Sequence, residues 1–126
     1  MWAKWPWCMC IAYNKAFADM KYLKPPTEPA DVSSCFHLYA TQIDFAALGK
    51  TRSQVMAELR EKGIGTQVHY IPVPTQPFYK NTYGYKDGDY PKAEKYYDQE
   101  LSLPLYPGLS DDDVNMVIKA VKEVIG

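Results

Sequence analysis

A capped helix followed by an extended segment constrains the fold more than any other feature of this sequence. Thr51 and Gln54 have the spacing of a capping box, in which the threonine hydroxyl accepts a helix amide and the glutamine reaches back to the cap. Gly63 supplies the left-handed residue that ends such a helix. Residues 65–71 then predict a strand, so this part of the chain favours a helix beside a sheet.

Periodicity and cap signals predict three further helices and two further strands. Apolar side chains at helical spacing predict a helix over residues 9–20. A proline at the first helical position predicts one over 91–100, and a serine followed by aspartates predicts one over 110–125. Strand-like composition covers residues 34–43 and 101–105. The prediction is a compact α/β (α+β) domain, with about four helices covering a small three-stranded sheet. The helix residues expected to face inward are Cys10, Tyr13, Phe17, Met20, Val55, Met56, Leu59, Ala93, Tyr96, Tyr97, Val114, Val117, Ile118, Val121 and Ile125.

Size and charge exclude several classes of protein. At 126 residues the chain fits one domain with a sizeable core. The formal net charge is −1 and the arginines are Arg52 and Arg60, so the sequence offers no basic footprint for nucleic acid. Since no stretch approaches the roughly 18 to 20 apolar residues of a membrane span, no membrane partner is expected.

The cysteines indicate a reduced environment. Cys8, Cys10 and Cys35 are odd in number, and their spacing fits neither a zinc site nor a disulfide framework. An apolar run near the start resembles part of a signal peptide, but Pro6 interrupts it and Lys15 stands just before the small residues of the apparent cleavage site. We therefore expect a cytoplasmic protein with no metal site.

Residues 1–10 form an atypical tryptophan-rich segment ahead of the domain expected over residues 11–126. The segment contains Trp2, Trp5 and Trp7. We do not expect these side chains to remain in water, because together they would expose a large apolar area. The segment either covers a surface of the domain or joins two copies of the chain. A third reading is that it is an unselected product of a truncated gene.

Four short runs, in this order and spacing, resemble a known family. They are Ser-Cys-Phe-His-Leu-Tyr at 34–39, Gly-Ile-Gly-Thr-Gln-Val-His-Tyr-Ile-Pro at 63–72, Gln-Pro-Phe-Tyr at 76–79 and Leu-Ser-Leu-Pro-Leu-Tyr-Pro-Gly-Leu-Ser at 101–110. Over about residues 11–125 the chain resembles the C-terminal small domain of the DegT/DnrJ/EryC1/StrS family of pyridoxal-phosphate-dependent nucleotide-sugar aminotransferases. The resemblance implies a mostly antiparallel sheet, like that of the C-terminal domain of fold-type I aminotransferases. It covers only the smaller part of such an enzyme.

A transaminase needs a lysine for the aldimine, an acid for the pyridinium nitrogen and donors for the cofactor phosphate. The resemblance implies that these groups belong to a large domain preceding the part seen here. Lys50 lies in a Gly-Lys-Thr sequence, but the capped helix accounts for the glycine and the threonine. The first glycine that a phosphate loop requires is also absent. We expect no catalytic residue and no cofactor in this chain, although the parent family uses pyridoxal phosphate.

His69, Tyr70 and Tyr79 are the candidate substrate-binding residues. Successive strand residues point to opposite faces, so one of His69 and Tyr70 can pack while the other faces the segment that follows. The resemblance implies that this strand and segment help to line a nucleotide-sugar pocket. His69 would then donate a hydrogen bond to substrate, and Tyr70 or Tyr79 would pack on the sugar or base. The alternative is that all three are packing residues.

Residues 72–90 predict a long irregular loop with a helical turn at 76–79. Loops of this length in compact domains are usually functional or mobile. Pro74 occupies a position that is commonly polar or aromatic in the family, and it has neither a donor side chain nor a backbone amide. A substrate contact from that position is therefore in doubt. His37 and Tyr39 are expected to be packing residues.

These features leave three hypotheses open. The first is a detached C-terminal domain of a nucleotide-sugar aminotransferase, inactive alone, whose partner is a second copy or a separate large domain. The second is a small module that binds a nucleotide sugar or associates with an aminotransferase. An independent enzyme with His69 as its base is the weakest, because neither a nucleophile nor a metal-ligand cluster accompanies that residue.

Overall fold

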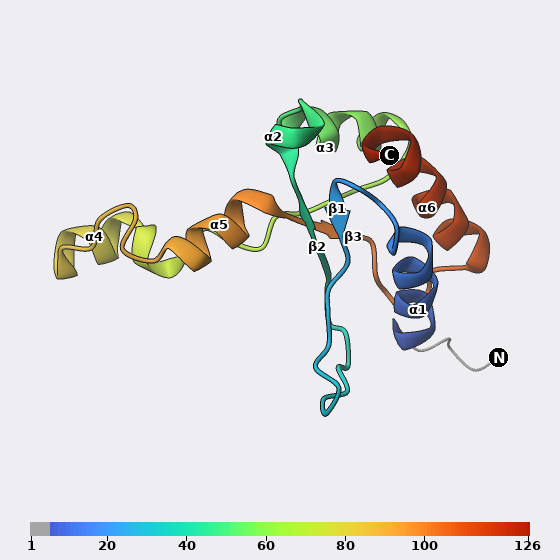
Figure 1. The fold of residues 1–126 in the computed structure, drawn as a ribbon, viewed down its shortest axis with the longest axis horizontal. Coiled ribbons are helices and arrows are strands. Elements are labelled where there is room, and N and C mark those ends of the chain that lie inside the picture. The colour runs from blue at the N-terminus through green and yellow to red at the C-terminus, as the bar shows by residue number, and fades with distance from the viewer. Residues whose placement is uncertain (1–5) are drawn as a thin grey trace.

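The computed structural model describes residues 6–126 (Figure 1). The helices of this part are α1 (Pro6–Phe17), α2 (Phe45–Leu48), α3 (Arg52–Glu61), α4 (Pro77–Tyr83), α5 (Pro91–Gln99) and α6 (Asp111–Ile125), with a 3-10 turn, η1, at Val73–Thr75. The strands are β1 (Leu23–Lys24), β2 (Tyr39–Ile43) and β3 (Glu100–Leu103). No helix in the described residues is both long enough and apolar enough to cross a membrane.

The three strands form one antiparallel sheet in the order β1-β2-β3. Leu23 pairs with Ile43 at one edge of β2, and Thr41 pairs with Leu101 at the other. Every residue of β3 is buried, including the charged Glu100. The expected fold class, an α/β domain with a small antiparallel sheet, is therefore confirmed.

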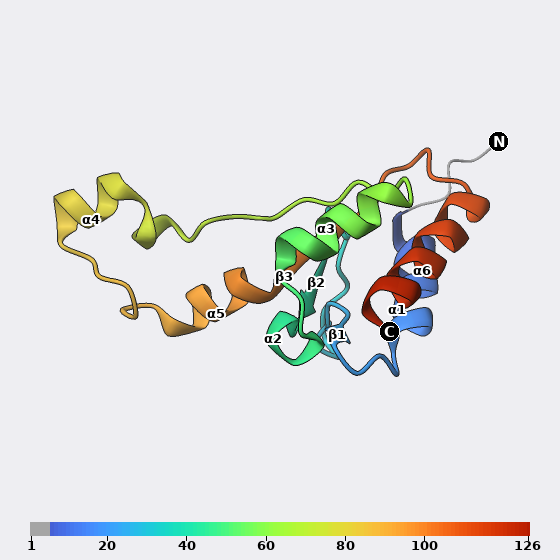
Figure 2. The ribbon, with the colours of Figure 1, turned by 90° about the horizontal axis from the view of Figure 1, so that it is seen from above.

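The molecule consists of a body and an arm. Figures 1 and 2 show α1, α3 and α6 gathered near the sheet, whereas α4 and α5 extend away from it. The core of the body includes a ring cluster, in which the centroids of Tyr13 and Tyr39 lie 4.9 Å apart and Phe17 packs against both. The Tyr13 hydroxyl donates to the Pro104 carbonyl oxygen at 3.0 Å. The Tyr39 hydroxyl donates to Asn14 Oδ1 at 2.7 Å. Burial raises the pKa of both tyrosines, so they serve as neutral packing groups.

The predicted cap signals form as expected. Thr51 and Gln54 make a reciprocal capping box at the start of α3, and Gly63 lies just past its end with φ of 80°. Ser110 and Asp113 make a second reciprocal box at the start of α6. The apolar stripes of these two helices also pack inward, with Met56 and Ile118 only partly buried.

The predicted strand over residues 65–71 is wrong. This segment runs beside β3 but makes only one isolated bridge, between Gln67 and Ser102, before the chain leaves the sheet. The third strand is instead β1, which is two residues long. The strand predicted over residues 34–43 is limited to β2, because the part before Tyr39 does not pair within the sheet.

Two helix predictions also need correction. The first helix runs from Pro6 to Phe17 instead of covering residues 9–20, and Met20 is only partly buried after its end. Helix α5 has no buried residue, because it lies in the arm and not over the sheet. Ala93 and Tyr96 are exposed and Tyr97 is half-buried, so the expected inward face does not exist in this chain.

The predictions for the N-terminal segment remain untested. Residues 1–5, with Trp2 and Trp5, lie outside the described residues, and so does the side chain of Trp7. The domain boundary expected at residue 10 likewise stays a prediction.

Candidate functional site

The segment from residue 63 to residue 70 is held against β3, on the side opposite β2. The buried side chain of Ile64 anchors its start. Gln67 and Ser102 then exchange two backbone hydrogen bonds, of 3.2 and 2.8 Å. This pairing places His69, two residues further on, beside the buried side chains of β3.

His69 is fixed by two side chains of that strand. Its backbone N–H donates to Glu100 Oε2 at 2.8 Å, and its ring Nδ1 lies 2.9 Å from Ser102 Oγ. The Ser102 hydroxyl donates in turn to Glu100 Oε1 at 2.5 Å. Glu100, Ser102 and His69 therefore form one connected polar network inside an apolar body. Every buried side-chain nitrogen or oxygen in the described residues has a hydrogen-bond partner.

The three predicted site residues are only partly brought together. The His69 and Tyr70 rings touch edge to face, with centroids 4.7 Å apart, instead of pointing to opposite faces of a strand. His69 is half-buried, whereas 75% of Tyr70 is exposed. Tyr79 lies on α4 in the arm, which Figures 1 and 2 show at a distance from the sheet. In this structure Tyr79 does not share a site with His69.

Aromatic side chains, each exposed or half-buried, form a row along the arm. The centroids of successive rings in the series Phe78, Tyr79, Tyr83, Tyr85 and Tyr90 lie between 5.3 and 6.0 Å apart. Neither α4 nor α5 has a buried residue, and Phe78 and Tyr83 are 65% and 60% exposed. Contiguous apolar surface of this kind commonly marks an interaction site.

A cavity of about 460 Å³ adjoins the network. It lies between the segment at residues 63–69, the exit of β3 and the first turns of α6, and both His69 and Ser102 line it. Its volume falls in the range of roughly 300 to 1,000 Å³ that is typical of small-molecule sites. The walls combine apolar side chains, such as Leu109 and Val117, with exposed backbone at Gly63 and Gly65.

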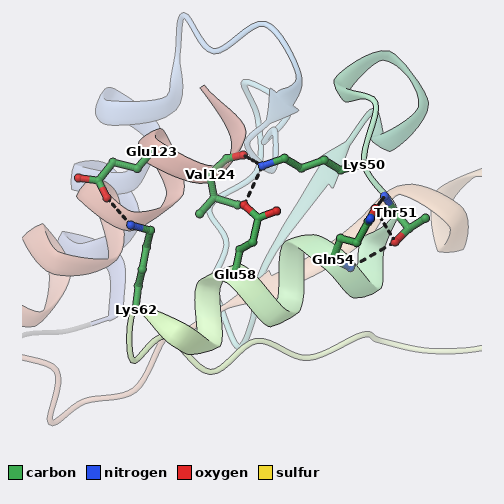
Figure 3. Close-up of polar contacts among 7 residues, drawn as sticks. All are labelled: Lys50, Thr51, Gln54, Glu58, Lys62, Glu123 and Val124. Carbon is green, nitrogen blue, oxygen red and sulfur yellow. Dashed lines mark hydrogen bonds and ion pairs between the residues drawn. The ribbon is translucent and has the colours of Figure 1, made fainter.

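Lys50 has a structural partner set (Figure 3). Its Nζ donates to Glu58 Oε2 at 2.7 Å and to the Val124 carbonyl at 2.9 Å, so it connects α3 to the end of α6. No lysine lines the cavity in the described part of the chain, and its one acidic residue, Asp113, accepts hydrogen bonds from the Ser110 cap. The cavity therefore does not fit pyridoxal phosphate. No group of three metal-ligating side chains occurs in residues 6–126.

Sequence reasoning missed Glu100 and Ser102, because they lie 31 and 33 positions from His69. The only available signal was a glutamate and a serine inside the otherwise apolar run of β3. Such residues need polar partners when they are buried. That signal indicates a network but does not identify its third member.

The fold is shared with an aminotransferase. The crystal structure of the aminotransferase TlmJ from Streptoalloteichus hindustanus superposes on this chain with a TM-score of 0.80 at 26% identity, covering 96% of the chain and 31% of TlmJ. The fold therefore places this chain in the aminotransferase class, and the chain corresponds to one part of such a protein.

Sequence comparisons give the family. The model of the DegT/DnrJ/EryC1/StrS aminotransferase family matches residues 9–122. The spore coat polysaccharide biosynthesis protein SpsC of Bacillus subtilis is 44% identical over 114 residues, which are 90% of this chain and 29% of SpsC. The UDP-4-amino-4-deoxy-L-arabinose–oxoglutarate aminotransferase of Shewanella sediminis is 34% identical over 96 residues, which are 73% of the chain and 25% of that enzyme. This chain belongs to the DegT/DnrJ/EryC1/StrS aminotransferase family, and it spans less than a third of the length of these relatives.

Proposed function

We propose that residues 9–122 serve as the small domain of a pyridoxal-phosphate-dependent nucleotide-sugar aminotransferase and are not catalytic by themselves. The observation that carries this proposal is the family match over nearly the whole chain, which spans only 29% of SpsC. The cavity lining, which lacks a lysine and a free acid in the described residues, supports it. Catalysis then requires a large domain that supplies the cofactor site.

The arm supports a dependence on such a partner. A row of aromatic side chains without buried members is costly to leave in water, since burying one large apolar side chain is worth about 1.5 to 3 kcal/mol. We propose that a large aminotransferase domain or a second copy of the chain covers this row. In that assembly His69, Tyr70 and Tyr79 contribute to the nucleotide-sugar pocket.

The cavity beside His69 favours a second candidate function, a small module that binds a nucleotide sugar without a large domain. The specific observation is that a cavity of ligand size already adjoins a fixed imidazole within the body. In this case the chain carries or presents the sugar, and the arm contacts an aminotransferase.

Thermal unfolding separates the two candidates. The purified chain is melted with and without pyridoxal phosphate and with a panel of UDP- and dTDP-linked sugars. A ligand that binds only the folded state adds roughly 2.7 kcal/mol at about 100 times its Kd, which raises the midpoint measurably. If the chain is a small domain that depends on a large one, no ligand should shift the midpoint of unfolding. The binding module predicts a shift with one sugar, reduced in His69→Ala and in Tyr70→Ala, and kept in the control His37→Ala, whose side chain is exposed elsewhere.

A further inference from the structure

We infer that Glu100 and Ser102 are positioning residues that hold His69 in its Nδ1–H tautomer, so that His69 presents a hydrogen-bond acceptor, Nε2, to a hydroxyl-bearing ligand in the cavity. Only the part that concerns a ligand rests on the proposed function. The tautomer is a property of the free chain and is tested without any ligand.

Glu100, which is fully buried, determines which groups of the network donate hydrogen bonds and which accept them. An ionised carboxylate only accepts hydrogen bonds. Its Oε2 accepts the backbone N–H of His69 at 2.8 Å, and its Oε1 accepts the hydroxyl of Ser102 at 2.5 Å. The second distance is in the range of about 2.5 to 2.7 Å that is typical of charge-assisted hydroxyl–carboxylate bonds. Both oxygens are therefore committed as acceptors.

Ser102 transmits this direction to the imidazole. A serine hydroxyl has one hydrogen, and here that hydrogen is donated to Glu100. Only the lone pairs of Ser102 Oγ remain for the ring nitrogen of His69, which lies 2.9 Å away. Nδ1 must then carry a hydrogen and donate it. In a neutral imidazole with Nδ1 protonated, Nε2 is an acceptor.

The competing state is the one in which donor and acceptor are reversed in the side-chain hydrogen bonds between Glu100, Ser102 and His69. If Glu100 carried an additional proton, the carboxyl would donate to Ser102 Oγ, and the Ser102 hydroxyl would donate to Nδ1 of His69. The imidazole hydrogen would then be on Nε2, which would become a donor. The competing state holds one proton more than the first, on Glu100, and it also reverses the Ser102 hydroxyl and moves the imidazole hydrogen from Nδ1 to Nε2. Heavy-atom distances alone do not distinguish the two states.

The polarity of Nε2 determines which ligand group His69 selects. Nε2 forms no hydrogen bond with residues 6–126, and His69 is one of the residues that line the cavity. A neutral His69 therefore accepts from a hydroxyl or an amide N–H and repels a carbonyl or ether oxygen. The resemblance implied a hydrogen-bond donor at this position, whereas the network assigns an acceptor. Sugar hydroxyls can act as donors, so they fit this site.

The test is a long-range ¹H–¹⁵N correlation spectrum of the ¹⁵N-labelled chain, recorded at a pH at which the His69 ring is neutral. The chain has two histidines, and His37→Gln assigns their signals. We expect a protonated-type Nδ1 and an unprotonated-type Nε2 for His69. The reverse pattern would overturn the inference, because it would mean that the Ser102 hydroxyl donates to Nδ1 of His69 instead of to Glu100.

Variants of β3 test the positioning role. In Ser102→Ala the acceptor for Nδ1–H is gone, so the His69 signals should move toward the Nε2–H form, whereas Ser102→Thr, which keeps a hydroxyl, should retain the wild-type pattern. Thr41→Ala is the matched control, because it removes a buried hydroxyl that donates to the Leu101 carbonyl of the same sheet without contacting His69. If the Ser102→Ala variant folds and its His69 signals are unchanged, Ser102 does not hold His69 in the Nδ1–H tautomer. If that variant does not fold, the wild-type spectrum and Ser102→Thr still decide the tautomer.

The ligand is tested separately with UDP-N-acetylglucosamine as the probe. Binding that shifts the Nε2 signal while Nδ1 stays protonated supports the acceptor role. Binding that puts the hydrogen on Nε2 contradicts it. An absence of binding counts against a nucleotide-sugar pocket in the isolated chain, while the spectrum of the free chain still decides the tautomer.

Discussion

At the scale of single residues, the buried carboxylate of Glu100 is predicted to stabilise the body. Glu100→Ala removes the acceptor for the Ser102 hydroxyl and for the His69 amide, which are then left unpaired in a buried site. Leaving a buried polar group unsatisfied costs about 1 to 3 kcal/mol. We therefore expect a fall of at least that order in the free energy of unfolding, measured by urea titration.

The matched control for Glu100 is Asp98→Ala. Asp98 is an exposed carboxylate two residues earlier in the chain, so its removal should change the free energy of unfolding by no more than about 0.5 kcal/mol. Equal effects of the two substitutions would mean that the Glu100 network contributes nothing specific to stability.

Two lysines in Figure 3 provide an internal comparison of ion pairs. Lys50 contacts Glu58 and also a carbonyl in the last turn of α6, whereas the Lys62 ammonium has one partner among the described residues, Glu123 at 2.6 Å. Exposed ion pairs are worth roughly 0 to 1 kcal/mol, while a carbonyl at a helix end needs a donor. We expect Lys50→Met to lower the free energy of unfolding by about 1 kcal/mol.

Lys62→Met should lower the free energy of unfolding by less than about 0.5 kcal/mol, since only a surface ion pair is lost. Chemical denaturation of both variants measures the difference. A larger loss for Lys62 than for Lys50 would contradict the role assigned to the Val124 carbonyl contact.

At the scale of elements, the cap of α6 predicts a pH dependence. Hydrogen bonds from the Ser110 hydroxyl and backbone N–H lower the pKa of Asp113 below its usual range. A carboxyl with a lowered folded pKa stabilises the folded state above its unfolded pKa, about 3.9 for aspartate, and this contribution is lost as the pH falls through the folded value. The stability difference between wild type and Asp113→Ala should therefore be full at pH 7 and shrink below about pH 4.

Urea titrations at several pH values measure this difference. Asp112→Ala is the control, because Asp112 is exposed in the same first helical turn and makes neither of these bonds. A difference for Asp113→Ala that stayed constant from pH 7 to pH 3 would show that the cap does not depend on the ionised carboxylate.

The arm should open and be cleaved before the body. Helices α4 and α5 bury none of their residues, and segments with few buried apolar contacts open locally at low free energy. Limited digestion with chymotrypsin should cut first beside Phe78, Tyr83 or Tyr90, and mass spectrometry identifies the sites. Tyr106 is the internal comparison, because it is 51% exposed but lies in the body between β3 and α6. A first cut at Tyr106 would contradict the division into body and arm.

At the scale of the whole molecule, sequence signals predicted the features that depend on neighbouring residues in the chain, namely helix caps and apolar helix faces. The two reciprocal caps and the stripes of α3 and α6 follow from neighbours within a few positions, and the structure has them. The strand expected at residues 65–71 failed because pairing depends on β3, which offers this segment one bridge. Strand β1 is two residues long and too short to show periodicity.

The candidate site was predictable only in part, for the same reason. His69 and Tyr70 were proposed from the family resemblance, and the structure places His69 beside β3 with the Tyr70 ring against it. Glu100 and Ser102 were not found, because their roles exist only after β3 and the segment before His69 pair. The inward face expected of α5 was wrong, because periodicity identifies an apolar face but not the surface that it packs against.

A domain exchange tests the central claim most directly. Residues 9–122 replace the matching region of the Shewanella sediminis aminotransferase, to which this chain is 34% identical, and aminotransfer by the hybrid is measured. Our account predicts detectable aminotransfer that falls when the exchanged part carries His69→Ala and persists when it carries His37→Ala. A folded hybrid that retains pyridoxal phosphate but shows no aminotransfer would contradict the assignment of this chain as the small domain of a sugar aminotransferase.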